Sequence, residues 1–479
     1  MNLDRIQHEL DMIAADPRSF MNRLPDKERR GALPAEPPFS AATVIDGRYI
    51  DERDRVRALL YSPPEETLEE AAIGPDDRPE NLVDRLVYTR AADIDEAGLL
   101  TAKLPESPWS DDYWAIYLGI LGKRYADEGF PSSTDFLENQ QYIAEHPVEA
   151  IVASGKQAAI DALSPSEKYD LLIGDDKGTL TRAMWTEGAS YQEHKGKVET
   201  WMGICHGWAP AAYMLPRPRK TVTVLAADGK TTLHMYPSDI KGLGSLLWAN
   251  GRSTTRFIGQ RCNEKDPKTD ANGRFVSASA FDNNPGSFHL CLVNQIGACK
   301  RGFVMDATFD YEVWNQPVFG YEMTYFNPMT MKAAPTLREA TVARADFVGD
   351  RFKRYRSGCA SIVGVSAEVR YVVETRPSHA PEDMPSRDAI TKVTYCYDLE
   401  LGEDGTIVGG EWYQNRHPDF LWTPPRGATM KTPWDVLAYE PWQAEAIMPL
   451  SWRMAARAAS TRALPHPKII SGLLRLAGG

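Results

Sequence analysis

The sequence predicts an α+β protein, with helices mainly in the first half of the chain and antiparallel strands in the second. Residues 109–125 and 136–163 carry apolar side chains at the spacing of amphipathic helices, so we expect helical packing there. Three later stretches alternate apolar and polar residues, which is typical of antiparallel strands. These stretches are residues 361–373, 389–401 and 406–413. The fold should therefore combine a helical lobe with an antiparallel sheet lobe.

Cap and turn residues place the remaining elements. Asp228-Gly229 has the composition of a tight hairpin turn, and Asp404-Gly405 has the same composition between the last two predicted strands. The predicted elements are a helix at 3–15, a hairpin of residues 221–225 and 231–236, a helix from 238 or 239 toward 248, and helical structure at 434–459.

Composition and charge exclude several classes of function. The chain has 479 residues, a formal net charge of −12 at pH 7 and 43% hydrophobic residues, which is a globular composition. The negative charge argues against nucleic acid or an anionic membrane as a partner. No apolar run could span a bilayer, and the first ten residues are polar and amphipathic, unlike a secretory signal. We therefore expect a cytoplasmic protein, or one exported by a signal-less route, and the sequence leaves its oligomeric state open.

The cysteines and acidic residues predict neither a disulfide framework nor a metal centre. Cysteines occur at positions 205, 262, 291, 299, 359 and 396. If one of them is a catalytic thiol, an odd number remains, which fits reduced residues better than full pairing. The chain has no C-x-x-C or H-E-x-x-H motif for zinc. The acidic loop at 266–272 is compatible with calcium but lacks the spacing of a hand-type site, so the sequence requires no cofactor.

Cys205 is the candidate nucleophile, because it lies where the backbone turns before an Ala-rich helical run. Gly203 and Gly207 flank the cysteine, and Pro210 indicates a nearby helix start, since proline is tolerated in a first turn. A thiol at a helix N-terminus is favoured in its nucleophilic thiolate form. A buried structural cysteine is the alternative interpretation of this residue alone.

His289 and Asp306 are the candidate base and its orienting carboxylate. Residues 285–306 contain two apolar runs around Gly297, which we interpret as an antiparallel hairpin. In a hairpin centred just after Gly297, His289 and Asp306 are direct cross-strand neighbours. The order Cys, His, Asp is then that of a papain-type triad, in which the carboxylate holds the imidazole. A hydrogen-bonded core histidine is one alternative, and His206 as the base is another.

Long, unusual sequence strings are distributed over residues 104–425. They are Tyr169-Asp-Leu-Leu-Ile-Gly-Asp175, Thr200-Trp-Met-Gly-Ile-Cys-His-Gly-Trp-Ala-Pro-Ala-Ala212, Asp239-Ile-Lys241, Asn294-Gln295 and Val313-Trp-Asn-Gln-Pro-Val-Phe-Gly-Tyr-Glu-Met323, with further matches at 108–114, 409–412 and 417–422. These strings resemble the transglutaminase elicitor family of oomycetes and bacteria. The string at 313–323 looks like the short surface peptide by which plants recognise the oomycete enzymes. It departs from that peptide at Phe319 and Glu322, where the oomycete form has basic residues.

The resemblance implies protein-glutamine γ-glutamyltransferase (transglutaminase) activity on a papain-like core. Cys205 would form a thioester with a glutamine side chain of a protein or peptide, with His289 moving the proton and Asp306 holding the imidazole. The acyl group would then pass to a lysine or another primary amine. The same triad suits a papain-like cysteine protease or a glutamine deamidase. A non-catalytic recognition or elicitor protein is the alternative of another class, and it would not need the three residues together.

Three tryptophans are candidates for supporting roles. The Trp201 indole N–H is a candidate oxyanion donor, because Glu199 stands where papain-like proteases often have a glutamine. Trp208 and Trp314 are candidates to line an aromatic channel for the acceptor amine. Trp314 should also exclude water from the thioester.

We divide the chain into three regions. Residues 1–103 contain no tryptophan and are rich in charge and proline, which indicates an N-terminal accessory region. Residues 104–425 form the predicted transglutaminase elicitor-like catalytic domain. Residues 426–479 form a C-terminal helical extension with a flexible tail.

Overall fold

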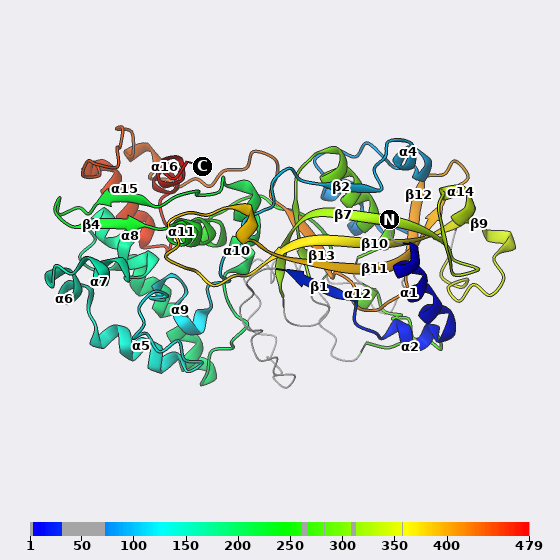
Figure 1. The fold of residues 1–479 in the computed structure, drawn as a ribbon, viewed down its shortest axis with the longest axis horizontal. Helices are drawn as coiled ribbons and strands as arrows, with labels where there is room; N and C mark the ends of the chain where they lie inside the picture. Colours follow the sequence, from blue (N-terminus) through cyan, green and yellow to red (C-terminus); the bar gives the residue numbers. More distant parts are fainter. Residues whose placement is uncertain are drawn as a thin grey trace.

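The structure is a computed structural model that describes residues 3–30, 72–260, 267–281, 283–307, 313–356 and 358–478. Figure 1 shows one side of the molecule to be mainly helical and the other to hold the long strands with a few helices beside them, and helix α10 (Cys205–Met214) lies at the junction. The described chain is therefore a mixed helix and antiparallel sheet protein, as the sequence predicts. Within these ranges, no helix is both long enough and apolar enough to cross a membrane.

One large antiparallel sheet dominates the strand side. Its main path runs in the order β1-β11-β10-β7-β6-β13-β5, and β2, β8, β9 and β12 pair with members of that path. The strands are β1 (Lys27–Arg30), β2 (Thr101–Lys103), β5 (Arg256–Gly259), β6 (Phe303–Asp306), β7 (Asn315–Asn327), β8 (Lys332–Ala334), β9 (Thr341–Ala343), β10 (Ser361–Val373), β11 (Ala389–Leu401), β12 (Ile407–Trp412) and β13 (Phe420–Thr423). A separate hairpin joins β3 (Val222–Leu225) and β4 (Thr232–Met235).

Helices lie on both sides of the molecule and near both ends of the chain (Figure 1). They are α1 (Leu3–Ala15), α2 (Pro17–Met21), α4 (Ala91–Glu96), α5 (Phe136–Glu145), α6 (Val148–Ala153), α7 (Gln157–Asp161), α8 (Pro165–Ile173), α9 (Thr179–Lys195), α10, α11 (Pro237–Asn250), α12 (Ala278–Phe281), α13 (Pro285–Cys291), α14 (Leu337–Ala340), α15 (Leu450–Ser460) and α16 (Pro467–Leu476). Helices α10 and α11 are largely buried and pack against each other.

Several predicted elements are confirmed with their boundaries. Strands β10 and β11 occupy 361–373 and 389–401, and helix α1 occupies 3–15. The hairpin of β3 and β4 and the helix α11 also lie where turn and cap residues placed them. These elements share a clear periodicity or a clear turn signal, so local sequence was sufficient to define them.

The predicted hairpin over residues 285–306 is wrong. Helix α13 occupies the first part, and a π-helical segment, η5 (Leu292–Ala298), continues it to β6. The side chain of Asn284 caps α13 by accepting the Gly286 N–H at 2.8 Å, and Pro285 occupies the first turn. Every residue of α13 is buried, so its sequence shows neither the helical nor the strand period. The Asn-Pro start was the overlooked helix signal.

Two predicted helical stretches differ in the structure. Residues 109–125 form irregular backbone with two short 3-10 turns, η3 (Ile116–Leu118) and η4 (Ile120–Gly122). Trp114 and Ile120 adopt positive φ angles of 50° and 51°, which a continuous α-helix does not allow. Residues 434–459 contain a 3-10 turn, η8 (Asp435–Leu437), and helix α15, with irregular backbone between them.

The N-terminal region contributes to the same sheet. Strand β1 pairs with β11, and β2 pairs with β7. Helix α1 supplies Ile6, Leu10 and Ile13 to a buried apolar cluster that also contains Phe326 of β7. The division of the chain at positions 103 and 425 stays a prediction.

Candidate active site

Cys205 is the first residue of helix α10, as the sequence predicts, and the flanking glycines allow this turn to pack tightly. A Cβ atom at Gly203 would lie 2.4 Å from the carbonyl oxygen of Tyr113, and one at Gly207 would lie 2.2 Å from the carbonyl oxygen of Ser245. Both glycines are therefore required for close backbone approach around the thiol. Pro210, by contrast, lies inside the helix and does not mark its first turn.

The Cys205 thiol is enclosed by the backbone and side chains that lead into β7. Cys205 is only 7% exposed. The sulfur lies 3.7 Å from the Val313 carbonyl oxygen, which accepts the S–H, and 3.7 Å from Nδ2 of Asn315, which donates to the sulfur. Burial raises the pKa of the Cys205 thiol to about 11, while the Asn315 donors lower this pKa and the charges of Glu374 and Asp306 raise it. The thiol is thus protonated at neutral pH in this conformation.

Asp306 lies close enough to the thiol for its charge to influence the Cys205 pKa. It is the last residue of β6 and pairs with Asn315, the first residue of β7. Its Oδ1 atom accepts the backbone N–H of Trp314 at 3.0 Å, and its side chain is fully buried. The structure therefore brings Cys205 and Asp306 to one site.

The structure does not bring His289 to that site, which corrects the predicted cross-strand register. His289 lies on helix α13, and its Nδ1 atom is 3.0 Å from the hydroxyl oxygen of Tyr397 on β11. Burial among apolar side chains lowers the pKa of His289 to about 3, so its ring is neutral. Asp306 pairs with Asn315 instead, because β6 is followed by β7 in the sheet and η5, not a strand, precedes it.

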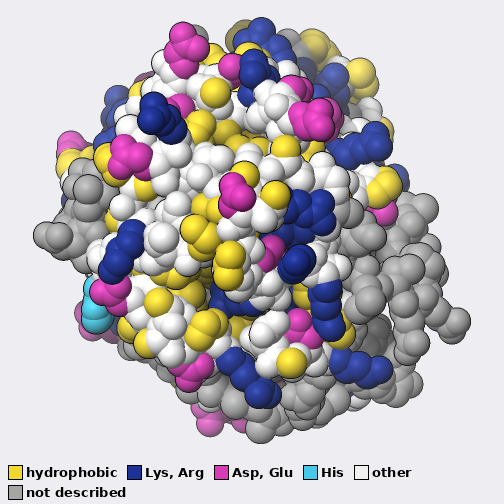
Figure 2. All heavy atoms as spheres, turned by 90° about the vertical axis from the view of Figure 1, so that its right-hand side faces the viewer, with side chains coloured by type: hydrophobic (Ala, Val, Ile, Leu, Met, Phe, Trp, Pro, Cys, Tyr) yellow, Lys and Arg dark blue, Asp and Glu magenta, His cyan; other side chains and the backbone are white. Residues whose placement is uncertain are grey.

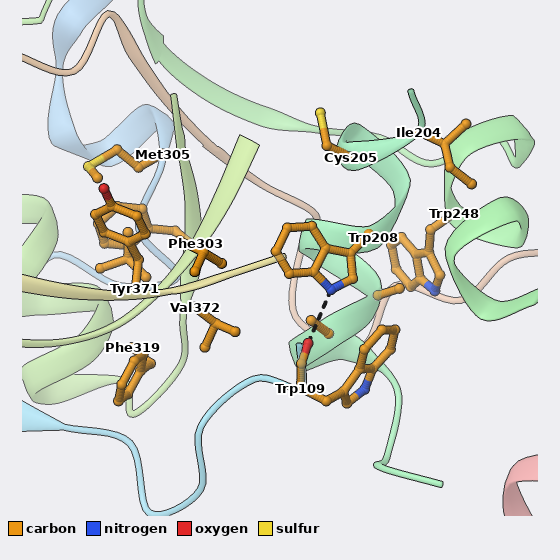
Figure 3. Packing of buried hydrophobic residues seen from close by; sticks show 14 of the residues in the cluster. Trp109, Ile204, Cys205, Trp208, Trp248, Phe303, Met305, Phe319, Tyr371 and Val372 are labelled. Atoms are coloured by element: carbon orange, nitrogen blue, oxygen red, sulfur yellow. Dashed lines mark hydrogen bonds between the residues drawn. The ribbon is translucent and has the colours of Figure 1, made fainter. Parts of the chain in front are cut away.

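The three candidate tryptophans have different environments. Trp208 is fully buried, and its indole N–H donates to the Trp109 carbonyl oxygen at 3.1 Å. Figure 3 shows its ring directed into the core while the Cys205 sulfur points away from it, and a role for Trp208 in lining a substrate channel stays a prediction. Trp314 is half-buried beside the thiol, with its ring centroid 5.5 Å from that of Tyr113. Trp201 is half-buried four residues before α10 begins, and its oxyanion role stays a prediction.

Three side chains at the site were not among the predicted site residues. Asn315 contacts the thiol, and its Oδ1 accepts the indole N–H of Trp422 on β13 at 2.7 Å. Glu374 follows β10, and its Oε1 accepts the Gln316 side-chain N–H at 2.7 Å. Burial raises the pKa of Glu374 to about 7. Asn315 and Trp422 lie in strings that carry the family resemblance, which was the available signal, whereas nothing local marks Glu374.

The described residues hold no group of three or more His, Cys, Asp or Glu side chains arranged to bind a metal. Residue 266 of the acidic loop and Cys262 lie outside the described residues. Within the described residues, the cysteines at 205, 291, 299, 359 and 396 are free thiols, and their reduced state in the cell stays a prediction.

A surface hollow between α4 and α14 lies at the far end of the sheet from α10 and is separate from the thiol (Figure 1). Its lining includes Leu337 and Arg338. Figure 2 shows that end of the molecule, where lysine and arginine side chains lie among apolar ones.

The fold resembles that of a solved transglutaminase. The GP42 transglutaminase from Phytophthora sojae matches 82% of this chain and 94% of its own, with a TM-score of 0.52 and 21% sequence identity. The overall fold is thus a transglutaminase-like fold. The family model described as Transglutaminase elicitor matches residues 88–437, and this chain belongs to that family. No curated protein sequence matches the chain.

Proposed function

We propose that this protein is a protein-glutamine γ-glutamyltransferase with a papain-like core, in which Cys205 is the nucleophile. The observation that carries the proposal is the position of Cys205 at the start of α10, facing the paired residues Asp306 and Asn315. Family membership supports acyl transfer as the reaction class. The N-terminal end of a helix and the nearby N–H donors favour negative charge on the sulfur once the site opens to substrate.

The reaction has two halves. The Cys205 sulfur bonds to the carboxamide carbon of a glutamine side chain, the C–N bond breaks, and ammonia leaves with the proton that the thiol gave up. A lysine or other primary amine then bonds to the same carbon, the C–S bond breaks, and the amine proton returns to the sulfur. Water in place of the amine would give glutamine deamidation.

The proton acceptor is a separate question from the nucleophile. His289 lies away from the thiol, and to act as the base its ring would have to leave Tyr397. We assign the role instead to Glu374, whose charge acts on the Cys205 thiol and whose pKa of about 7 suits a base at neutral pH. Asp306 would then act through its charge and through the backbone of Trp314 that it holds.

Recognition by other proteins is the alternative function of another class. Residues 315–321 are buried within β7, which lies between β10 and β6 in the sheet. A receptor would reach this string only after the strand left the sheet. The burial of the string therefore favours a role in building the active site over a role as a surface epitope of the folded chain.

The test is incubation with a glutamine donor peptide and a labelled primary amine, with ammonia release and amine incorporation followed separately. Wild-type protein should release ammonia and incorporate the amine, and Cys205→Ala should do neither while remaining folded. Cys299→Ala is the matched control, because Cys299 is a free, partly exposed thiol elsewhere in the chain. Ammonia release without incorporation would indicate a deamidase, and full activity in Cys205→Ala would contradict the proposal.

A further inference from the structure

Three neighbouring strands present one face to the start of helix α10. In the sheet, β13 pairs with β6, and β6 pairs with β7. Val304 and Trp422 are cross-strand partners and cluster with Ala209 of α10, so this face of the sheet is directed at that helix. Asp306 is two residues beyond Val304 and therefore lies on the same face, opposite its partner Asn315.

A chain of hydrogen bonds crosses this face to the thiol. The Trp422 indole N–H donates to Oδ1 of Asn315 at 2.7 Å, and Nδ2 of Asn315 donates to the Cys205 sulfur at 3.7 Å. An indole nitrogen can only donate, so it requires the amide oxygen of Asn315 on its side. The amide nitrogen must then face the sulfur. Trp422 thus determines which end of the Asn315 amide meets the thiol.

We propose that Asn315 is a catalytic residue that stabilises negative charge at the Cys205 sulfur and at the oxyanion of the acyl-transfer intermediate, and that Trp422 is its positioning residue. The oxyanion role rests on the proposed acyl transfer. In this proposal the oxyanion donor is Asn315, whereas the sequence suggested Trp201.

The geometry fits both stages of the first half-reaction. When the thiolate forms, the Asn315 amide N–H faces it directly. When the sulfur bonds to the carboxamide carbon, the carbonyl π electrons move to oxygen, and the C–N bond then breaks as the carbonyl re-forms. The oxyanion is attached to the carbon that bonds the sulfur, so a donor 3.7 Å from the sulfur can reach it after a small shift. Asn315 is only 4% exposed, so its amide is held in a largely dry site.

These two hydrogen bonds also explain why an apolar residue could not replace the asparagine at position 315. Replacing the amide would leave the buried Trp422 N–H without its acceptor as well as the sulfur without its donor. The Trp422 N–H and the Cys205 sulfur would then each lose this hydrogen-bond partner where α10 meets the sheet.

The test compares Asn315→Ala, Asn315→Asp and Trp422→Phe. The first readout is the pH dependence of Cys205 alkylation by iodoacetamide, which needs no transferase activity. We expect Asn315→Ala to alkylate about tenfold more slowly at a given pH because the thiol pKa rises, and Asn315→Asp to be slower still because it adds a negative charge. The second readout is kcat with a glutamine donor, expected to fall about 10²- to 10³-fold in Asn315→Ala with little change in KM.

Trp422→Phe should reproduce part of both effects, because the amide loses the contact that sets its orientation. Trp412→Phe is the matched control, since Trp412 is also buried and its indole N–H donates to the Asn283 carbonyl oxygen, not to a site residue. Folded Asn315→Ala with wild-type alkylation and kcat would overturn the proposal, as would a Trp422→Phe effect no larger than that of Trp412→Phe. If wild-type protein transfers no amine but the alkylation shift appears, the proposed function fails while the Asn315 contact stands.

Discussion

Oδ1 of Asp306 accepts a hydrogen bond from the backbone N–H of Trp314, 3.0 Å away, and so ties the end of β6 to the residue before β7. This contact holds the chain at Val313, whose carbonyl oxygen faces the Cys205 sulfur. Asp306 therefore acts on the thiol in two ways, through its charge and through the backbone it fixes.

The two actions of Asp306 can be separated by substitution. Asp306→Asn keeps an oxygen acceptor for Trp314 but removes the charge that raises the Cys205 pKa, so alkylation should become about tenfold faster at a given pH below that pKa. Asp306→Ala removes both the acceptor and the charge, and it should also lower the free energy of unfolding by about 1 kcal/mol, because the partly buried Trp314 N–H loses its acceptor. Iodoacetamide rates and urea unfolding measure the two effects. Slower alkylation in a folded Asp306→Asn protein would contradict this account.

The raised pKa of the thiol predicts slow chemistry in the absence of substrate. At pH 8, three units below a pKa of about 11, about one Cys205 in a thousand is a thiolate. The alkylation rate should therefore still rise at pH 9. A glutamine donor peptide should change the alkylation rate, because it either opens the site or occupies the thiol. A rate that levels off near pH 7 without substrate would show that the buried thiol is already ionised.

Glu374 should impose a pH limit on activity. Its carboxyl gains negative charge as the pH rises through about 7, so a base at this position is lost as the pH falls below that value. Glu374→Gln should lower kcat about 10²-fold and remove the limb near pH 7 from the pH–rate profile. His289→Phe is the companion variant and should keep the wild-type profile. If His289→Phe abolishes that limb while folded, the imidazole is the base and our assignment of Glu374 is wrong.

Trp208 and Trp314 should respond differently to truncation. Trp208→Ala should lower the free energy of unfolding by about 3–5 kcal/mol, because a fully buried ring and its hydrogen bond to Trp109 are lost.

Trp314→Ala should lower the free energy of unfolding by about 2 kcal/mol, since this residue is only half-buried. It should also raise the ratio of hydrolysis to amine transfer. Trp314→Phe should preserve the contact with Tyr113 and most of the wild-type ratio. An unchanged ratio in Trp314→Ala would place this residue outside the water shield.

The sequence predicted the periodic parts of the fold and the residue at the centre of the site. Strands β10 and β11 alternate buried and half-buried residues over part of their length, and Asp404-Gly405 marks the turn after β11. Cys205 could be located because its flanking glycines and the following helix are local features. Asp306 was also placed near the thiol, although for the wrong reason.

The failures have a common physical origin in burial. Helix α13 and segment η5 are buried on nearly every side, so the register that paired His289 with Asp306 had no periodic pattern to test it. Residues 109–125 pack Trp109 and Trp114 in the core through irregular backbone that no simple period describes. The relation between Trp422, Asn315 and Cys205 joins residues more than a hundred positions apart and depends on strand order. One sequence cannot supply that order.

The measurement that tests the central claim most directly is the mass of the protein after incubation with a glutamine donor peptide and no amine. We predict an adduct equal to the donor minus ammonia, located on the peptide that contains Cys205, released by a primary amine and absent in Cys205→Ala. An adduct on another residue, or amine incorporation in Cys205→Ala, would contradict the account.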